Sequence, residues 1–147
     1  MGATLLPAMA DGGSEEIGNV RLIQAVLEAF NERDVDAIVD AADPKLAFFA
    51  PTALIADRKH DLYRGHDGIR LYFDDVARHW DELHIAPENF HSSDDGVIAI
   101  GTARGKTRSG TMLESRVAWA CRVRDSKIAW LRVYTNPDDA FEDLGLK

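Results

Sequence analysis

The sequence has very little cysteine: Cys121 is the only one in 147 residues. One cysteine can form neither an intramolecular disulfide nor the paired ligands of a CxxC metal or redox motif, so both kinds of site are excluded. The five histidines are not spaced as in an HExxH-type metal motif. We therefore expect no metal ion and no cofactor. The lack of disulfides favours a reducing, cytoplasmic location.

Long hydrophobic runs are also missing. Residues 1–13 contain only a short apolar stretch around Leu5, Leu6 and Met9, with no basic residue before it. A transmembrane helix needs about 20 apolar residues and a signal peptide needs a basic start, so we expect neither. We expect residues 1–13 to be a flexible tail and residues 14–147 to form a single domain, because one hydrophobic core is usual at this length.

Basic residues are few relative to acidic ones. The chain has 17 Lys and Arg against 25 Asp and Glu, which gives a formal net charge of −8. Proteins that bind nucleic acids or anionic lipids neutralise phosphate groups with clustered Lys and Arg. The charge balance therefore argues against a nucleic acid or a membrane surface as the partner.

The first half of the chain has the apolar spacing of amphipathic helices. Apolar residues recur every three or four positions over residues 14–32, over a shorter segment capped by Asp34, and from Ile69 to Trp80. Residues 45–50 are predicted to form a strand between the second and third helices. The polar segment 51–65 is predicted to be a loop.

The second half has no helical period and is predicted to form antiparallel strands separated by turns. Pro87 should break the first of these strands or place it at the sheet edge, because proline has no N–H to donate. Asn136 and Pro137 are typical of a helix start, and Gly145 of a helix end. The strands are expected at residues 83–92, 97–106, 113–124 and 128–135.

Strand register decides which side chains face the helices. A two-residue turn at Ser109-Gly110 would place Ile98 opposite Cys121 and Ile100 opposite Trp119. A three-residue loop at 125–127 would continue this face onto the last strand. The predicted inner face therefore carries Ile98, Ile100, Thr102, Arg104, Val117, Trp119, Ala129, Leu131 and Val133.

The opposite face of the sheet combines large aromatic side chains with small alanines. Such a surface is typical of a subunit interface, so we expect a homodimer; a solvated outer face is the alternative. The residues on this face are Ala118, Ala120, Arg122, Trp130, Arg132 and Tyr134.

Three segments resemble the SnoaL-like family: FNERDVD at 30–36, YRGHDGIR at 63–70, and RDSKI at 124–128 followed by RVY at 132–134. This family belongs to the larger group of ketosteroid isomerase, limonene epoxide hydrolase, polyketide cyclases and nuclear transport factor two-like binding domains. The resemblance covers about residues 16–146. It implies an α+β fold, with a cone-shaped, curved and mostly antiparallel sheet packed against three N-terminal helices, and a short C-terminal helix.

The resemblance also implies where catalytic groups would stand. The general-base Asp of ketosteroid isomerase matches Ala50, its phenolic donor matches Val26, and its protonated Asp falls at about Trp119. That mechanism needs a base and two oxyanion donors, and this sequence has none of them there. The water-holding and acid/base positions of limonene epoxide hydrolase, the last of them shared with polyketide cyclases, match Phe48, Ala50, Thr102, Arg104 and Val133.

We therefore expect a pocket for a small apolar or aromatic molecule. Arg104 would either hold an anionic oxygen of the ligand or reach the rim and pair with an acid, and Asp57, His60 and Asp61 could supply a base from the loop. The protein would be an isomerase, cyclase, dehydratase or hydrolase; the alternative is a noncatalytic ligand-binding or dimerisation module. The expected pocket residues are Phe30, Phe48, Tyr72, Thr102, Arg104, Trp119 and Val133.

Overall fold

The computed structural model describes residues 7–50, 62–92 and 96–145, with side chains described from Ile17 onward. In chain order the elements are α1 (Pro7–Glu32), α2 (Val35–Ala41), β1 (Ala42–Phe49), β2 (Leu62–Arg64), α3 (Gly65–His79), β3 (Trp80–Ser92), β4 (Gly96–Thr107), β5 (Met112–Arg124), β6 (Lys127–Tyr134) and α4 (Pro137–Asp143).

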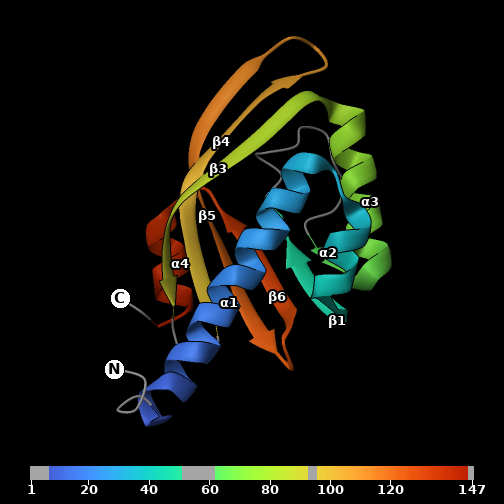
Figure 1. The fold of residues 1–147 in the computed structure, drawn as a ribbon. Helices are drawn as coiled ribbons and strands as arrows, with labels where there is room; N and C mark the ends of the chain where they lie inside the picture. Colours follow the sequence, from blue (N-terminus) through green and yellow to red (C-terminus); the bar gives the residue numbers. More distant parts are fainter. Residues whose placement is uncertain (1–6, 51–61, 93–95, 146–147) are drawn as a thin grey trace.

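The six strands form one curved, unclosed sheet in the order β2-β1-β6-β5-β4-β3. Neighbouring strands are antiparallel except for β1 and β6, which are parallel. Helices α1, α2 and α3 lie on the inner face of the sheet and α4 lies on the outer face (Figure 1). The predicted α+β architecture, with three N-terminal helices against a curved sheet and a short C-terminal helix, is confirmed.

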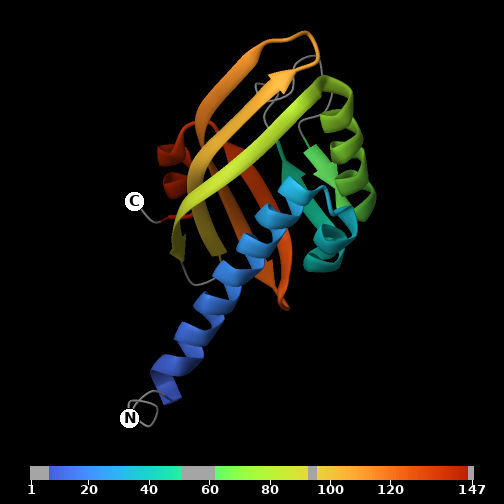
Figure 2. The ribbon, with the colours of Figure 1, turned by 45° about the horizontal axis from the view of Figure 1, so that its top comes forward.

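The first two helices follow the sequence pattern, with one shifted end. Helix α1 begins at Pro7, before the predicted start at Ser14. Its N-terminal part extends past the sheet (Figure 2), which leaves Ile17 55% exposed although its spacing predicted burial. Asp34 caps α2 as predicted, because its carboxylate accepts a hydrogen bond from the Ala37 N–H. Within the described residues, none of the helices has both the length and the apolar character needed to cross a bilayer.

Helix α3 ends one residue earlier than predicted. Trp80 has an extended backbone (φ −122°, ψ 133°) and is the first residue of β3 instead of the last residue of the helix. Strand β3 is an edge strand, and its pairing with β4 shifts between Pro87 and Asn89. Both features agree with the expected effect of Pro87.

The segment predicted as a polar loop contains a short strand. Strand β2 pairs antiparallel with β1, with Phe48 opposite Tyr63. Three residues are too few for an alternating apolar pattern to be recognised in the sequence. Residues 51–61, which include Asp57, His60 and Asp61, lie outside the described residues.

The β4–β5 hairpin has a longer loop than predicted. It contains three residues, 108–110, because the Thr107 N–H donates a hydrogen bond to the Thr111 carbonyl (2.9 Å). Gly110 takes a left-handed conformation (φ 97°), which a three-residue hairpin loop requires and which glycine adopts without strain. The predicted two-residue turn is therefore wrong.

One additional loop residue shifts the register of β4, so each β4 side chain lies on the face opposite to the predicted one. Ile98 lies opposite Ala120 instead of the predicted Cys121. Thr102 and Arg104 consequently lie on the outer face and not in the predicted pocket, and Arg104 is exposed. The β4 residues that reach the inner core are Val97, Ala99 and Ala103.

The β5–β6 register agrees with the prediction over most of its length, with Trp119 opposite Val133. The loop differs, because it contains only Asp125 and Ser126, with φ values of 53° and 64°. Positive φ at both positions is the signature of a type I′ turn, whose twist suits a tight hairpin.

A bulge between Arg122 and Val123 compensates for the shorter loop. Val123 pairs with Ile128 on the turn side of the bulge, and Arg122 pairs with Trp130 on the other side. As a result Ile128 is in the inner core (2% exposed), in the place predicted for Ala129.

Helix α4 covers part of the outer face of the sheet. It starts as predicted, with Asn136 as its cap and Pro137 in its first turn. The Tyr134 hydroxyl donates a hydrogen bond to Asp143 Oδ2 (2.6 Å), which ties α4 to β6. The second apolar core beneath α4 consists of Ile98, Ile100, Ala118, Ala120, Tyr134 and Ala140.

This packing changes the prediction for the outer face. Ala118 and Ala120 are fully buried within the chain, so they are neither solvated nor available to a second copy. Arg122 lies over the ring of Trp130, with 5.3 Å from its guanidinium carbon to the ring centroid. Homodimerisation through Trp130 and Arg132 stays a prediction.

Candidate ligand-binding site

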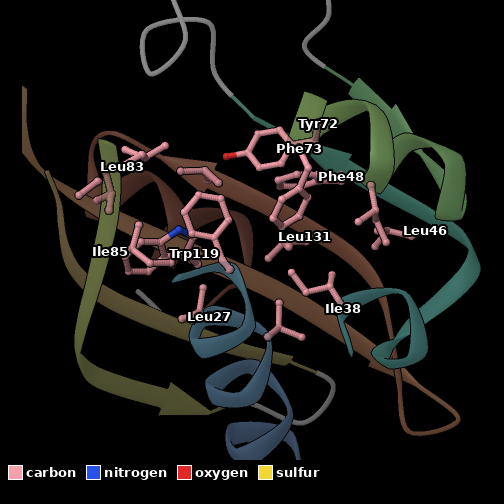
Figure 3. A pocket seen from close by; sticks show the side chains of 16 residues that line it. Leu27, Ile38, Leu46, Phe48, Tyr72, Phe73, Leu83, Ile85, Trp119 and Leu131 are labelled. Atoms are coloured by element: carbon pink, nitrogen blue, oxygen red, sulfur yellow. The ribbon is translucent and has the colours of Figure 1, made fainter. Parts of the chain in front are cut away.

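An apolar cavity of about 60 Å³ lies between the inner face of the sheet and helices α1, α2 and α3. In Figure 3, Leu83 and Ile85 lie at one end of the cavity, and Ile38 and Leu46 lie at the other. The lining residues are Val26, Leu27, Phe30, Ile38, Leu46, Phe48, Ile69, Tyr72, Phe73, Leu83, Ile85, Ala103, Val117, Trp119, Leu131 and Val133. Of their side chains, only those of Tyr72 and Trp119 carry a polar atom.

Five of the seven residues expected to line the pocket do line this cavity: Phe30, Phe48, Tyr72, Trp119 and Val133. Thr102 and Arg104 do not, because the β4–β5 register places them on the other side of the sheet. The cavity therefore lacks the arginine on which the expected anion-binding role depended. Ligand binding by the other five residues stays a prediction.

Aromatic contacts hold Tyr72 in place. Its ring meets the ring of Phe48 edge-on, with centroids 4.7 Å apart and planes at 75°. Its ring centroid also lies 5.9 Å from that of Phe73, with the planes at 90°, and 6.1 Å from that of Phe30, with the planes at 39°. Edge-to-face pairs are favourable beyond the area that they bury, so the phenol is presented to the cavity in a fixed orientation.

Arg33 is a cation beside the cavity that the sequence analysis did not identify. Its Nη1 donates to the Phe30 carbonyl (2.6 Å), its Nη2 donates to the Leu83 carbonyl (2.7 Å), and its guanidinium carbon lies 4.4 Å from the centroid of the Phe30 ring. Burial lowers the pKa of the guanidinium, and the neighbouring Tyr72 phenol acts in the opposite direction. In the sequence, Arg33 belongs to the FNERDVD segment, and nothing in that segment indicates a contact with the cavity.

Asn31 supports the same end of the cavity. Its Nδ2 donates to the Ile85 carbonyl (2.8 Å), and its Oδ1 accepts from the Ile85 N–H (2.9 Å). Together with Arg33, it ties the C-terminal end of α1 to β3. Two of the lining residues, Leu83 and Ile85, are positioned in this way.

The buried carboxylate of Asp75 belongs to a structural contact. Asp75 is 5% exposed, accepts a hydrogen bond from the Tyr63 hydroxyl (2.7 Å), and lies 3.4 Å from Arg78 Nη2. It does not line the cavity. The described part of the lining thus offers no carboxylate or imidazole, and the described residues include no cluster of His, Cys, Asp or Glu suited to a metal ion.

A wider cleft of about 420 Å³ adjoins the cavity, and Leu83 and Ala103 line both. Trp80 and Ser115 are among the residues that line it, and their atoms Nε1 and Oγ are buried without a hydrogen-bond partner among the residues that the structure describes. The other residues that line the cleft are Gly105, Leu113, Glu114, Arg116 and Thr135.

Several solved structures have the same fold as this chain. The chain is similar to TerC co-crystallised with polyporic acid, with 23% identity, a TM-score of 0.74, and 86% of this chain and 97% of that chain covered. It is also similar to an NTF2-like protein from Burkholderia thailandensis E264, with 25% identity, a TM-score of 0.69, and 82% of this chain and 95% of that chain covered. A third similar structure is an LEH-like epoxide hydrolase of M. tuberculosis, with 18% identity, a TM-score of 0.66, and 88% of this chain and 91% of that chain covered. These likenesses establish the fold.

The family relationship comes from the sequence. A comparison with curated proteins finds no match. A family model of the SnoaL-like domain, however, matches residues 23–131, which run from the buried part of α1 to the cavity residue Leu131 on β6. The match includes more than half of the chain and most of the elements that enclose the cavity. The chain therefore belongs to the SnoaL-like domain family.

Proposed function

We propose that this protein binds a small, largely apolar organic molecule in the cavity between the sheet and helices α1 to α3. The observation that carries the proposal is the lining: of its sixteen described side chains, fourteen are pure hydrocarbon, and they surround unfilled space. Empty space in a core costs stability, because the lining atoms lose dispersion contacts. A bound apolar molecule restores these contacts. The co-crystallisation of the similar protein TerC with polyporic acid supports a ligand of this kind.

The size of the cavity limits what it can hold. A volume of about 60 Å³ is well below the range of about 300–1,000 Å³ that is usual for ligand pockets. A ligand of ordinary size must therefore displace lining side chains or extend into the adjoining cleft. Flat aromatic molecules fit best, because the rings of Tyr72, Phe48 and Trp119 can pack against their faces.

A catalytic version of the proposal is the second candidate. In it the bound molecule is isomerised, cyclised, dehydrated or hydrolysed. Its support is the Tyr72 hydroxyl, the one group in the described lining that could donate or accept a proton in such a step. The same lining offers no carboxylate or imidazole to work with it, which favours noncatalytic binding as the primary function.

A cavity-filling substitution tests the proposal. Isothermal titration of the wild type with 2-ethylnaphthalene should show binding, and Ala103→Leu should weaken it at least about tenfold, because the larger side chain occupies the space in which the ligand packs. Ala37→Leu, on the exposed side of α2, is the matched control and should bind as the wild type does. Val117→Phe is a second filling variant, in case Ala103→Leu unfolds. Unchanged binding in both filling variants would contradict the proposal.

A further inference from the structure

Two residues that line the cleft each carry a buried polar atom without a hydrogen-bond partner in the described part of the chain. Trp80 is 5% exposed, and its Nε1–H has no acceptor among the described residues; Ser115 is half-buried, and its Oγ also has no partner there. Such groups are uncommon in folded proteins, because each has lost its hydrogen bonds to water without replacing them. Both residues line the cleft that adjoins the apolar cavity.

The surrounding structure fixes both residues. Position 105 needs glycine, because a Cβ there would lie 2.6 Å from Cζ3 of Trp80, so the indole packs closely on the backbone of β4. Ser115 lies on β5 opposite Ala103, a residue shared by the cleft and the cavity. Strand β6 ends at Tyr134, opposite Ala118, so among the described strands this part of β5 pairs with β4 alone. The serine therefore lies beyond the end of β6.

We infer that this cleft is a subsite for a neutral carbonyl oxygen of the ligand, which accepts hydrogen bonds from Trp80 Nε1–H and Ser115 Oγ–H. The apolar body of the same molecule occupies the adjoining cavity, so the inference rests on the proposed function. An indole nitrogen can only donate, which requires an acceptor on the ligand. A hydroxyl can turn to donate to the same atom.

The charges at the cleft favour a neutral acceptor over a carboxylate. Arg116 forms an ion pair with Glu88, with 3.3 Å between Nη1 and Oε1. Glu114 and Arg116 lie opposite Arg104 and Thr102, so their side chains belong to the outer face of the sheet and not to the side of Ser115. Within the described lining, no cationic side chain therefore stands on the Ser115 side of the cleft to neutralise a carboxylate, whereas a ketone, ester or amide oxygen needs none.

Three probes with one aromatic body test the inference: 2-acetylnaphthalene, 2-ethylnaphthalene and 2-naphthoate. Their dissociation constants are measured by isothermal titration for the wild type, Ser115→Ala and Trp80→Phe. Each variant removes one donor and should raise the dissociation constant of 2-acetylnaphthalene about fivefold, which corresponds to the loss of one net hydrogen bond. The dissociation constant of 2-ethylnaphthalene should change less than about twofold. In the wild type, 2-naphthoate should bind more weakly than 2-acetylnaphthalene. The matched controls Ser92→Ala and Trp130→Phe, outside the cleft, should alter none of these values.

The outcomes separate the inference from the proposed function. If all three probes bind but neither variant weakens 2-acetylnaphthalene selectively, the subsite is wrong and the cavity proposal survives. If 2-naphthoate binds as tightly as the ketone, the preference for a neutral oxygen is wrong. If no probe binds to the wild type, the proposed function fails and the subsite fails with it. The two variants act independently, so misfolding of one leaves the other as a test.

Discussion

Arg33 holds the C-terminal end of α1 against β3 through two backbone carbonyls, those of Phe30 and Leu83. Arg33→Lys should lower the free energy of unfolding by about 1–2 kcal/mol, because a single ammonium cannot reproduce the forked contact. Urea melts measure this change. Arg70→Lys is the control: Arg70 pairs with Asp67 on the exposed surface of α3, and the loss there should stay below about 0.5 kcal/mol. Equal losses in both variants would show that the Arg33 contact contributes nothing specific.

Ser126 has a left-handed backbone (φ 64°) in the β5–β6 turn. Ser126→Gly should raise stability by up to about 1 kcal/mol, because glycine adopts this conformation without steric cost. Ser109, in the β4–β5 loop, does not have a positive φ, so the control variant Ser109→Gly should give no gain in stability. A clear loss of stability for Ser126→Gly in urea melts, at unchanged m-value, would contradict the type I′ turn.

The same two loops show how far the sequence could determine the site. The β4–β5 segment contains one serine-glycine pair, which fits a two-residue turn as well as the last two positions of a three-residue loop. Nothing local distinguishes them, since the choice depends on which face of β4 packs against α1 and which against α4. One residue of error moved Thr102 and Arg104 out of the predicted pocket, whereas Trp119 and Val133, on strands with the correct register, were placed on the right face.

Helix α4 is held to the outer face of the sheet by the Tyr134–Asp143 hydrogen bond (2.6 Å). Burial, and next the hydrogen bond to Asp143, raises the pKa of Tyr134 above its ordinary value of about 10. Below that value the phenol is protonated in both the folded and the unfolded chain. Above it the unfolded chain releases the proton first, so stability is lost as pH rises.

Tyr134→Phe tests this contact. At neutral pH the variant should be about 1 kcal/mol less stable than the wild type, because the hydrogen bond is gone. Between about pH 9 and pH 11 this difference should shrink, since only the wild type still carries the phenol whose ionisation favours unfolding. Urea melts across this range measure the difference, and a gap that stays constant with pH would contradict the account.

Helix positions were more predictable than helix lengths and partners. The spacing of Ile23, Leu27 and Phe30 placed α1 on the sheet correctly, because an apolar stripe must be buried. The same rule could not show that α1 extends past the sheet, which leaves Ile17 exposed. It also could not show that α4 covers Ala118 and Ala120, since the sequence specifies an apolar surface and not its partner.

We expect the protein to form a homodimer through the part of the outer face that α4 leaves open. Trp130 is only half-buried there; Arg122 lies over its ring, and Arg132 lies over the ring of Tyr134. Sedimentation at micromolar concentration should show a dimer, and Trp130→Glu should shift it to a monomer, because a buried carboxylate in the contact is unfavourable. A monomeric wild type would contradict the expectation.

Ligand binding in the space between the sheet and helices α1 to α3 can be observed in a crystal structure of the wild type grown with 2-acetylnaphthalene. We expect electron density for the naphthalene rings between Tyr72 and Trp119, with the carbonyl oxygen within about 3 Å of Trp80 Nε1 or Ser115 Oγ, a normal hydrogen-bond distance. Density for the compound only on the outer surface, with the cavity side chains unmoved, would contradict it.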